Sequence, residues 1–414
     1  MSEPAPTPRA PPLAAASLIA VIFINQLGFG IIVPLLPFFA KSYHAAPWQI
    51  ALVFSAYSVG AFFGEPFWGR LSDRVGRKPI LISTVCGNVL LYLALAHAPT
   101  IGAAFVMRLV GGMTSGNQAV VQGYIADVTP PERRTRIFSW MAAAWNVGLI
   151  VGPSIGGLFA HPSAGPAGFR IPLFIAAGLS AASAICIALF IRESRVRDQS
   201  ASRRPNRWAA LSEAAHHPAI SRLMLLTFLV GFAFTGIEST FGLWGQARFG
   251  WGPREVGVCF FFVGVCAALT QLMLTARLSE RFGEGAMLAV GMILTMVAAA
   301  LQPLSPGAVV TIALMCLTAV GQSVAFPNVG ALLTRAADPH RQGQFLGLNN
   351  AAGALARVTG PFCASLTFSH LSINGPFVQS ALVTAPAIWL ALQAARRVAP
   401  VRRRPCGDAP IALH

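Results

Sequence analysis

Acidic residues are scarce in this chain, whose 414 residues include 14 Asp and Glu against 30 Lys and Arg. Charged residues of both signs make up 11% of the sequence, whereas hydrophobic residues make up 55%. A soluble globule of this size needs more charge than that to cover its surface, so the composition excludes a soluble protein. Together with a mean hydropathy of +0.63, it predicts an integral membrane protein.

Cysteine is also sparse, and none of the seven cysteines has the spacing of a metal site. The sequence has no His-Glu-x-x-His motif, no paired intramembrane aspartates and no nucleophile elbow, which are signatures of membrane-embedded enzymes. We therefore expect neither enzyme activity nor a bound metal. A sensor or scaffold is a further alternative, but it would need an appended soluble domain to pass on a signal, and the apolar runs leave no room for one.

Long apolar runs fill most of the chain, and a spanning helix needs about 20 such residues. The runs predict twelve spans, at about 14–40, 48–71, 79–98, 101–126, 136–160, 169–191, 219–245, 254–277, 285–303, 307–335, 342–368 and 375–395. Most of the basic residues then lie on one side of the membrane, together with both termini. Because cytoplasmic loops carry the excess of Lys and Arg, both termini are expected to be cytoplasmic. Contact with lipid headgroups then explains the net charge of +16, and no nucleic acid partner is expected.

The chain divides into two similar halves. The residues 69–76 return as 276–283, and the segment 133–153 returns at nearly the same offset as 341–361. Two such repeats predict a duplication of six helices. We expect a cytoplasmic N-terminal tail (1–13), an N-terminal six-helix bundle (14–191), a cytoplasmic linker (192–218), a C-terminal six-helix bundle (219–395) and a basic cytoplasmic tail (396–414).

A short, densely charged segment joins the second and third runs. It reads Gly69-Arg-Leu-Ser-Asp-Arg-Val-Gly-Arg-Lys78, and its glycines suit a tight turn while its four bases suit anionic headgroups. The segment resembles the G-x-L-x-D-R-x-G-R-K signature of the major facilitator superfamily. That resemblance implies an all-α membrane protein with twelve transmembrane helices in two pseudo-symmetric six-helix bundles. It also implies a conformational gate in which Asp127, at the end of the fourth span, pairs with Arg77, and whose other members are Gly69, Asp73, Arg74, Gly76 and Lys78.

Three spans resemble the drug/proton antiporters of this superfamily. The first, from Asn25 to Pro37, is similar to the opening helix of tetracycline and multidrug antiporters, although many of those carry an acid near the place of Asn25. The fourth, from Arg108 to Gln118, is similar to their Arg-and-glycine motif. The fifth is similar to their antiporter motif, although close helix packing alone also uses small residues. Its matching residues are Gly148, Gly152, Pro153, Gly156 and Gly157.

Charged and polar residues inside apolar runs are costly in a bilayer, so they are functional candidates. Glu238 in the seventh span is the first candidate for the proton carrier, because burial disfavours its charged form and lets it alternate between two protonation states. Glu65 is the second, although pairing with a hinge arginine or with Arg341 is an alternative role. The remaining candidates line a substrate cavity, and for all but Arg108, whose depth in an apolar run favours function, bridging of neighbouring helices is an equal alternative. They are Arg108, Asn25, Gln26, Asn117, Gln118, Asn146, Gln271, Gln322, Asn328, Asn349 and Arg357.

These features predict a transporter that exports amphipathic drugs or similar small molecules across the cytoplasmic (inner) membrane in exchange for protons. Its partners would be a small amphipathic substrate, protons and the lipid bilayer. The proton gradient would drive it, so no cofactor is expected, and a monomer is the expected oligomeric state. The alternative on the same fold is a facilitator or symporter for a small metabolite, and the residues do not identify the substrate.

Overall fold

A computed structural model describes residues 12–115, 117–129, 131–194, 217–336 and 342–397, and these are almost entirely helical. In the first half of the chain the helices are α1 (Pro12–Ile32), η1 (Val33–Leu35), α2 (Leu36–Lys41), α3 (Pro47–Val75), α4 (Arg77–Ala96), α5 (Ile101–Thr114), α6 (Asn117–Val128), α7 (Pro131–Phe159), η2 (Pro162–Phe169) and α8 (Arg170–Phe190). In the second half they are α10 (Pro218–Phe249), α11 (Pro253–Leu269), η3 (Thr270–Thr275), α12 (Ala276–Phe282), α13 (Glu284–Leu301), η4 (Gln302–Leu304), α14 (Ala308–Ala336), α15 (Gln342–His370) and α16 (Gly375–Arg397). The segment η3 is π-helical, and η1, η2 and η4 are 3-10 helices.

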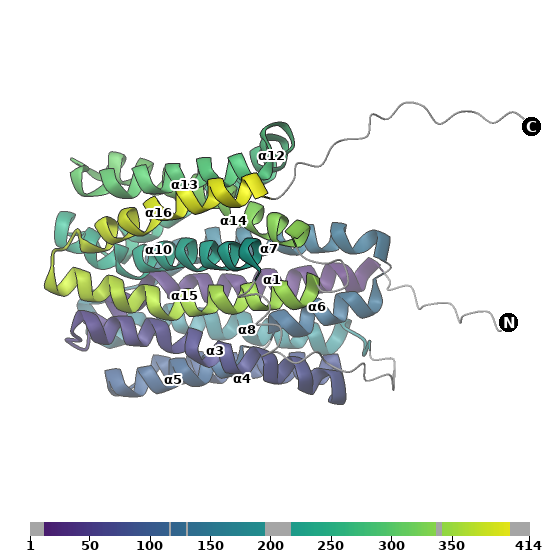
Figure 1. Cartoon of the computed structure of the whole chain (residues 1–414). Coiled ribbons are helices and arrows are strands. Elements are labelled where there is room, and N and C mark those ends of the chain that lie inside the picture. The colour runs from purple at the N-terminus through teal and green to yellow at the C-terminus, as the bar shows by residue number, and fades with distance from the viewer. Residues whose placement is uncertain (1–11, 116, 130, 195–216, 337–341, 398–414) are drawn as a thin grey trace, which may run out of the picture.

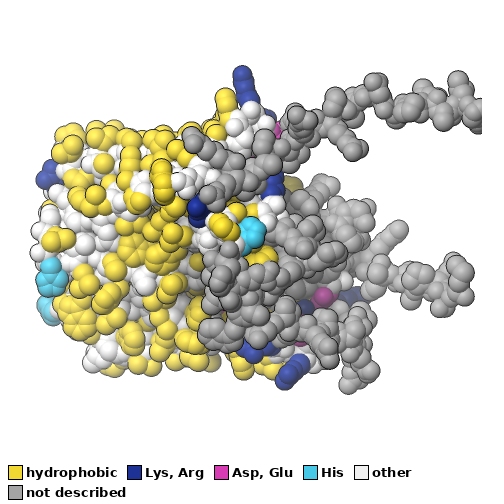
Figure 2. Space-filling model, viewed as in Figure 1, with side chains coloured by type: hydrophobic (Ala, Val, Ile, Leu, Met, Phe, Trp, Pro, Cys, Tyr) yellow, Lys and Arg dark blue, Asp and Glu magenta, His cyan; other side chains and the backbone are white. Residues whose placement is uncertain are grey.

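Joined end to end, the helices of the described residues form twelve rods that lie side by side (Figure 1). Nine helical segments within this part of the chain are long and apolar enough to cross a membrane. Hydrophobic side chains cover much of the face seen in Figure 2, and the few Lys and Arg visible on it lie mostly toward the end that carries the termini. The chain is therefore an integral membrane protein, and its twelve rods match the twelve spans that the apolar runs predict.

The packing of the rods repeats between the two halves. In the first half α1 packs on α7 and on α8, and α4 packs on α8; in the second, α10 packs on α15 and on α16, and α13 packs on α16. Contacts between the halves repeat in the same way, because α3 packs on α15 and α11 packs on α7. Since each of these contacts has its counterpart in the other half, the fold consists of two pseudo-symmetric six-helix bundles. The borders of the linker and of the two tails stay predictions, because most of these residues lie outside the described ranges.

The predicted fourth span is not one continuous helix. The helix α5 ends at Thr114 and α6 begins at Asn117, and Ser115 has a ψ of 44°, outside helical geometry. Ser115 Oγ donates to the Gly112 carbonyl oxygen at 2.6 Å, which satisfies an acceptor at the end of α5. Gly, Thr, Ser and Asn favour the helix less than Ala or Leu do, and they follow one another here. The sequence thus carries a local signal for this break.

One apolar cluster joins the two halves at one end of the bundle. We call the end where α1 begins and α16 ends the proximal end, and the opposite end the distal end. The cluster, which we call the distal core, includes Ile31 and Phe38 from the first half and Phe241, Trp244 and Trp251 from the second. Each of these side chains is buried, and Trp244 is wholly inaccessible to solvent. The halves therefore share a hydrophobic core at the distal end.

The proximal end is built differently, because each half has a cluster of its own there. One includes Leu81 and Ile125 of the first half, and the other includes Leu288 and Leu332 of the second. These side chains are buried among helices of their own half. The conformation is thus closed at the distal end and divided between two cores at the proximal end.

The turn between α3 and α4 is formed at Gly76. This residue has φ 124° and ψ 156°, a backbone region that is essentially restricted to glycine. Its counterpart in the second half, Gly283, has φ 85° and ψ 149°. The expectation that Gly69 also helps to form the turn is wrong, because Gly69 lies inside α3, which continues to Val75. The repeat signals this, since the residue at the equivalent place is Ala276, which avoids glycine-only geometry.

Replacing Gly76 by Ala should destabilise the protein, because alanine would be strained in this backbone conformation. Its Cβ would also lie 2.7 Å from Glu193 Oε2. We expect a loss of about 1–3 kcal/mol, measured as a lower melting temperature in detergent. The control is Gly69→Ala, which lies inside a helix and should leave the melting temperature unchanged or slightly higher. Equal losses in the two variants would show that Gly76 has no special place in the turn.

Candidate functional site

Two acids and an arginine from both halves of the chain lie within electrostatic range inside the spans. Glu65 lies on α3 and Glu238 on α10, and both side chains are half-buried. Arg357, on α15, is close enough to interact electrostatically with both carboxyl groups. We call Glu65, Glu238 and Arg357 the charged triad. Because Glu65 belongs to the first half and the other two to the second, the triad spans the contact between α3 and α15.

The charged triad combines two carboxyl groups, which can bind and release protons, with one permanent cation. A carboxyl group that is partly removed from water gains and loses a proton more readily near neutral pH than an exposed one, and a neighbouring cation favours its charged form. Glu65 and Glu238 interact with the same cation, so Arg357 favours the charged form of either one. The sequence identified the three residues separately. It held no signal that Arg357 is the cation that interacts with both acids, because the three residues are distant along the chain.

Arg108 lies on α5 in the first half and shares Tyr57 as an electrostatic neighbour with Glu65 and Arg357. Its side chain is 2% exposed, and its guanidinium carbon lies 4.7 Å from the centre of the Tyr57 ring. Tyr92 on α4 is a second electrostatic neighbour. The Nε of Arg108 is buried without a hydrogen-bond partner. In this conformation the side chain of Arg108 therefore extends from α5 to pack against α3 and α4, and stacking on tyrosine offsets part of the cost of its burial.

The glycines of the predicted antiporter motif hold α7 against two different helices. Gly148 and Gly152 lie against α1, where a Cβ at Gly152 would come within 2.7 Å of Gly30. Gly156 also faces α1. Gly157 instead faces the other half, and a Cβ there would lie 2.5 Å from the carbonyl oxygen of Pro253 at the start of α11. The motif therefore permits close approach both within the first half and between the halves.

Several of the predicted cavity residues bond to neighbouring helices or to their own helix. Asn25 Nδ2 donates to Ser183 Oγ on α8 at 3.3 Å. Asn349 Oδ1 accepts from Thr227 Oγ1 on α10 at 2.6 Å. Asn328 is buried, and its Nδ2 donates to a carbonyl oxygen one turn earlier in α14. These amides act as links between or along helices within one half.

The other predicted polar residues are placed as follows. Gln26 is buried, with its Nε2 lacking a hydrogen-bond partner. Gln322 on α14 and Gln271 in the π-helical segment η3 are half-buried. The side chains of Asn117, Gln118 and Asn146, and the whole of Arg341, lie outside the part of the chain that the structure describes.

An ion-pair network at the proximal end is centred on Arg77. Its Nη1 lies 2.8 Å from Asp73 Oδ1, and its Nε lies 3.0 Å from Asp127 Oδ2 at the end of α6. Arg77 Nη1 also donates to Ser72 Oγ at 2.7 Å. The pairing of Arg77 with Asp127 that the family resemblance implies is thus present in this conformation. The same turn carries Arg74, which is exposed.

Glu193 joins this network from the end of α8. Its Oε1 accepts from the backbone N–H of Arg77 at 2.8 Å, and its Oε2 accepts from that of Lys78 at 3.1 Å. A carboxylate at a helix N-terminus satisfies free N–H groups and interacts favourably with the helix dipole. Lys78 Nζ in turn donates to the Ala188 carbonyl oxygen of α8 at 2.7 Å. Sequence reasoning missed Glu193, because nothing in the sequence shows that the start of the linker lies beside the start of α4.

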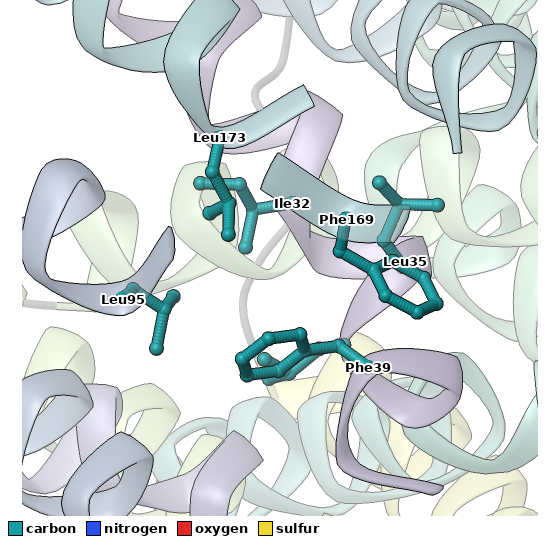
Figure 3. Close-up of a pocket in the computed structure, with 7 residues that line it drawn as sticks. Ile32, Leu35, Phe39, Leu95, Phe169 and Leu173 are labelled. Atoms are coloured by element: carbon teal, nitrogen blue, oxygen red, sulfur yellow. The ribbon is translucent and has the colours of Figure 1, made fainter. Parts of the chain in front are cut away.

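Among the described residues, two cavities have mainly apolar linings, and neither includes a member of the charged triad. The smaller has a volume of about 10 Å³ and lies in the distal part of the first half (Figure 3). An apolar void of that size has no partners for a water molecule, so it is a packing defect of the core. The side chains around it are Ile32, Leu35, Leu36, Phe39, Leu95, Phe169 and Leu173.

A polar contact accompanies the distal core where the halves meet. Lys41 Nζ at the end of α2 donates to Gln246 Oε1 of α10 at 2.7 Å. A small buried cluster beside it in the chain also combines both halves and consists of Ala40, Ile50 and Leu243. The distal closure therefore consists of aromatic and aliphatic packing, with a charged amine bound to an amide at its edge.

Comparison with known proteins gives consistent results over nearly the whole chain. A sequence model described as Major Facilitator Superfamily matches residues 18–267 and 223–410. The chain is 24% identical to Multidrug resistance protein 2 of Bacillus subtilis over 380 residues, which cover 91% of this chain and 93% of that protein. It is 26% identical to Tetracycline resistance protein, class C, of Escherichia coli over 361 residues, or 85% of this chain and 89% of that protein. The fold is similar to that of a bacterial homologue of the human lysosomal transporter Spinster, solved in an inward-facing and occupied conformation, with a TM-score of 0.76, 15% identity and coverage of 92% of this chain and 96% of that one.

Proposed function

Because the chain belongs to the Major Facilitator Superfamily, we propose that it exports amphipathic small molecules, drugs among them, in exchange for protons. The observation that carries this proposal is the charged triad, in which acids from both halves of an integral membrane protein share Arg357. Acids inside the membrane are suited to proton exchange when they lie near a cation at the contact between two halves that move relative to each other. The names of the similar proteins, for multidrug and tetracycline resistance, support an amphipathic cargo.

Transport follows from alternating access of a central site to the two sides of the membrane. In the conformation described here the distal core holds the halves together, and the proximal end has two separate cores. This is the state in which cargo enters from the proximal side. Opening of the distal core and closing of the proximal end would release the cargo distally, with the proximal side being the cytoplasmic side of the inner membrane.

In the proposed cycle Glu238 takes up a proton from the distal side and releases it on the proximal side, and Glu65 is the second proton-carrying candidate. Arg357 stabilises whichever carboxyl group is charged. The ion pairs of Arg77 with Asp73 and Asp127 hold the proximal turn in one arrangement. The proton gradient supplies the driving force, and no cofactor takes part.

Purified protein in sealed vesicles tests the proposal. With an imposed pH gradient, the vesicles should accumulate ethidium or tetracycline, and a dye inside should report proton movement in the opposite direction. A proton uncoupler should abolish the accumulation. Drug movement that is indifferent to the uncoupler would overturn proton exchange in favour of a facilitator, and proton movement in the same direction as a small metabolite would favour a symporter.

A further inference from the structure

The larger of the two cavities is a groove of about 230 Å³ between α3, α5 and α15. Its walls include Val59 of α3, Leu109 of α5 and Phe362 of α15. Its lining is apolar except for Ser55, whose Oγ donates to the Val358 carbonyl oxygen of α15 at 2.9 Å. The groove therefore lies on the seam between the halves, with its one lining hydroxyl already hydrogen-bonded.

The groove opens away from the interior of the bundle. On α3, Tyr57 points inward, since its ring lies 5.4 Å from that of Phe29 on α1 and beneath Arg108. Successive residues of a helix are rotated by about 100°, so Val59 and Phe63 lie on the opposite side of α3 from Tyr57 and its neighbour Ala61. Phe63 is 63% exposed. On α15, Phe362 is likewise exposed, so the groove faces the lipid.

The depth of the groove places it mainly in one leaflet. The helix α3 begins at Pro47, and Trp48 beside it is half exposed, as is typical of aromatic residues at a membrane interface. With a rise of 1.5 Å per residue, the lining residues Leu52 and Val59 lie about 8 and about 18 Å from that end of α3. Half of a hydrocarbon core of about 30 Å is about 15 Å. The groove therefore extends from the acyl chains of the distal leaflet to about the middle of the membrane.

We infer that an acyl chain of a distal-leaflet phospholipid occupies this groove as a bound ligand. An empty space of this size deprives its walls of van der Waals contacts. Water cannot replace those contacts, because the walls offer it almost no hydrogen-bond partners. A hydrocarbon chain matches the lining chemically and is the component of the membrane that surrounds the opening. Since both halves line the groove, the chain is held at the seam where the halves must move.

Photocrosslinking of the native chain tests this inference. The protein is placed in vesicles of phosphatidylethanolamine and phosphatidylglycerol that contain a phospholipid with a diazirine in the middle of one acyl chain, and adducts are mapped by peptide mass spectrometry. We expect several-fold more adducts at Val59, Leu109 and Phe362 than at Leu90 of α4. Leu90 is a control near the depth of Leu109 and Phe362, because it is 69% exposed and lies about 9 Å from the distal end of its helix, while those two lie about 12 Å from theirs. Equal adduct yields at all four residues would overturn the inference.

A second arm uses variants. Val59→Phe should fill the groove and reduce the adducts at Leu109 and Phe362 several-fold, whereas Leu90→Phe should leave them unchanged. Retention of these adducts in Val59→Phe would contradict a chain bound within the groove. Loss of the adducts when tetracycline or ethidium is added to the native protein would assign the groove to the transported cargo instead. None of these readouts depends on transport, so failure here is distinguishable from failure of the proposed proton exchange.

Discussion

Replacing Glu238 by Gln is expected to abolish drug-driven proton movement in vesicles, reducing it to the level of protein-free vesicles. Glutamine keeps the shape and hydrogen-bonding capacity of the half-buried side chain but cannot release a proton. Binding of the drug itself should change only a few-fold, because the distal core and the helix contacts are untouched. The measurement is the pH change on drug addition, together with drug binding to the same preparation.

Glu65 provides the comparison within the charged triad. It interacts with the same Arg357 from the other half of the protein. The variant Glu65→Gln therefore tests whether Glu238 alone carries the proton or both acids share that role. If Glu238 is the carrier, Glu65→Gln should retain proton movement at a reduced rate. The control for substitution of an acid in general is Glu280→Gln, at an exposed residue of α12, which should behave as the native protein does. Full proton movement in both Glu238→Gln and the double variant of Glu65 and Glu238 would eliminate the triad as the coupling site.

The second large effect is expected from Gly157→Ala, which should shift the protein toward a conformation that is open at the distal end. The added Cβ would lie 2.5 Å from the Pro253 carbonyl oxygen, so α7 and α11 must separate. Overpacking of this kind costs about 1–3 kcal/mol, which corresponds to about a 5- to 150-fold change in the equilibrium between closed and open states. Transport should slow accordingly, because the closed state becomes harder to reach.

A buried distal residue can report this shift. Ala40→Cys places a thiol in the buried cluster between α2 and α10, and its rate of reaction with a membrane-impermeant maleimide measures distal opening, after subtraction of the reaction of the native cysteines. We expect faster labelling when Gly157→Ala is added. The matched control is Gly178→Ala in α8, where a new Cβ would meet no atom within 4 Å. The same labelling rate in both would contradict the role of Gly157 in closure.

The fold was predictable from the sequence to the level of its spans and its duplication. Apolar runs of about 20 residues leave a bilayer-spanning helix as the structure that satisfies every backbone hydrogen bond. The repeat of residues 69–76 at 276–283 likewise predicts equivalent turns, and Gly76 and Gly283 adopt similar positive-φ geometry. The break at Ser115 was not predicted, because hydropathy reports burial in lipid and is insensitive to helix continuity.

The candidate site was predictable only residue by residue. The cost of a charge in a bilayer marks Glu65, Glu238, Arg108 and Arg357 individually. Which of these meet depends on how helices distant in sequence cross, and single-sequence patterns carry no information on that. Arg108 illustrates the consequence, since it looks equivalent to Arg357 in the sequence but stacks on Tyr57 of its own half. Family resemblance did better for the pair of Arg77 and Asp127, because it carries a spatial relation along with the letters.

The make-up of the distal core has a consequence for how the protein responds to cold. Its closure depends on aromatic and aliphatic side chains whose separation would expose them to water. The hydrophobic effect weakens on cooling, whereas the ion pairs at the proximal end are weakened by rising ionic strength. A fall in temperature should therefore loosen the distal seal independently of any stiffening of the lipid, and screening of charges by salt should have little effect on it.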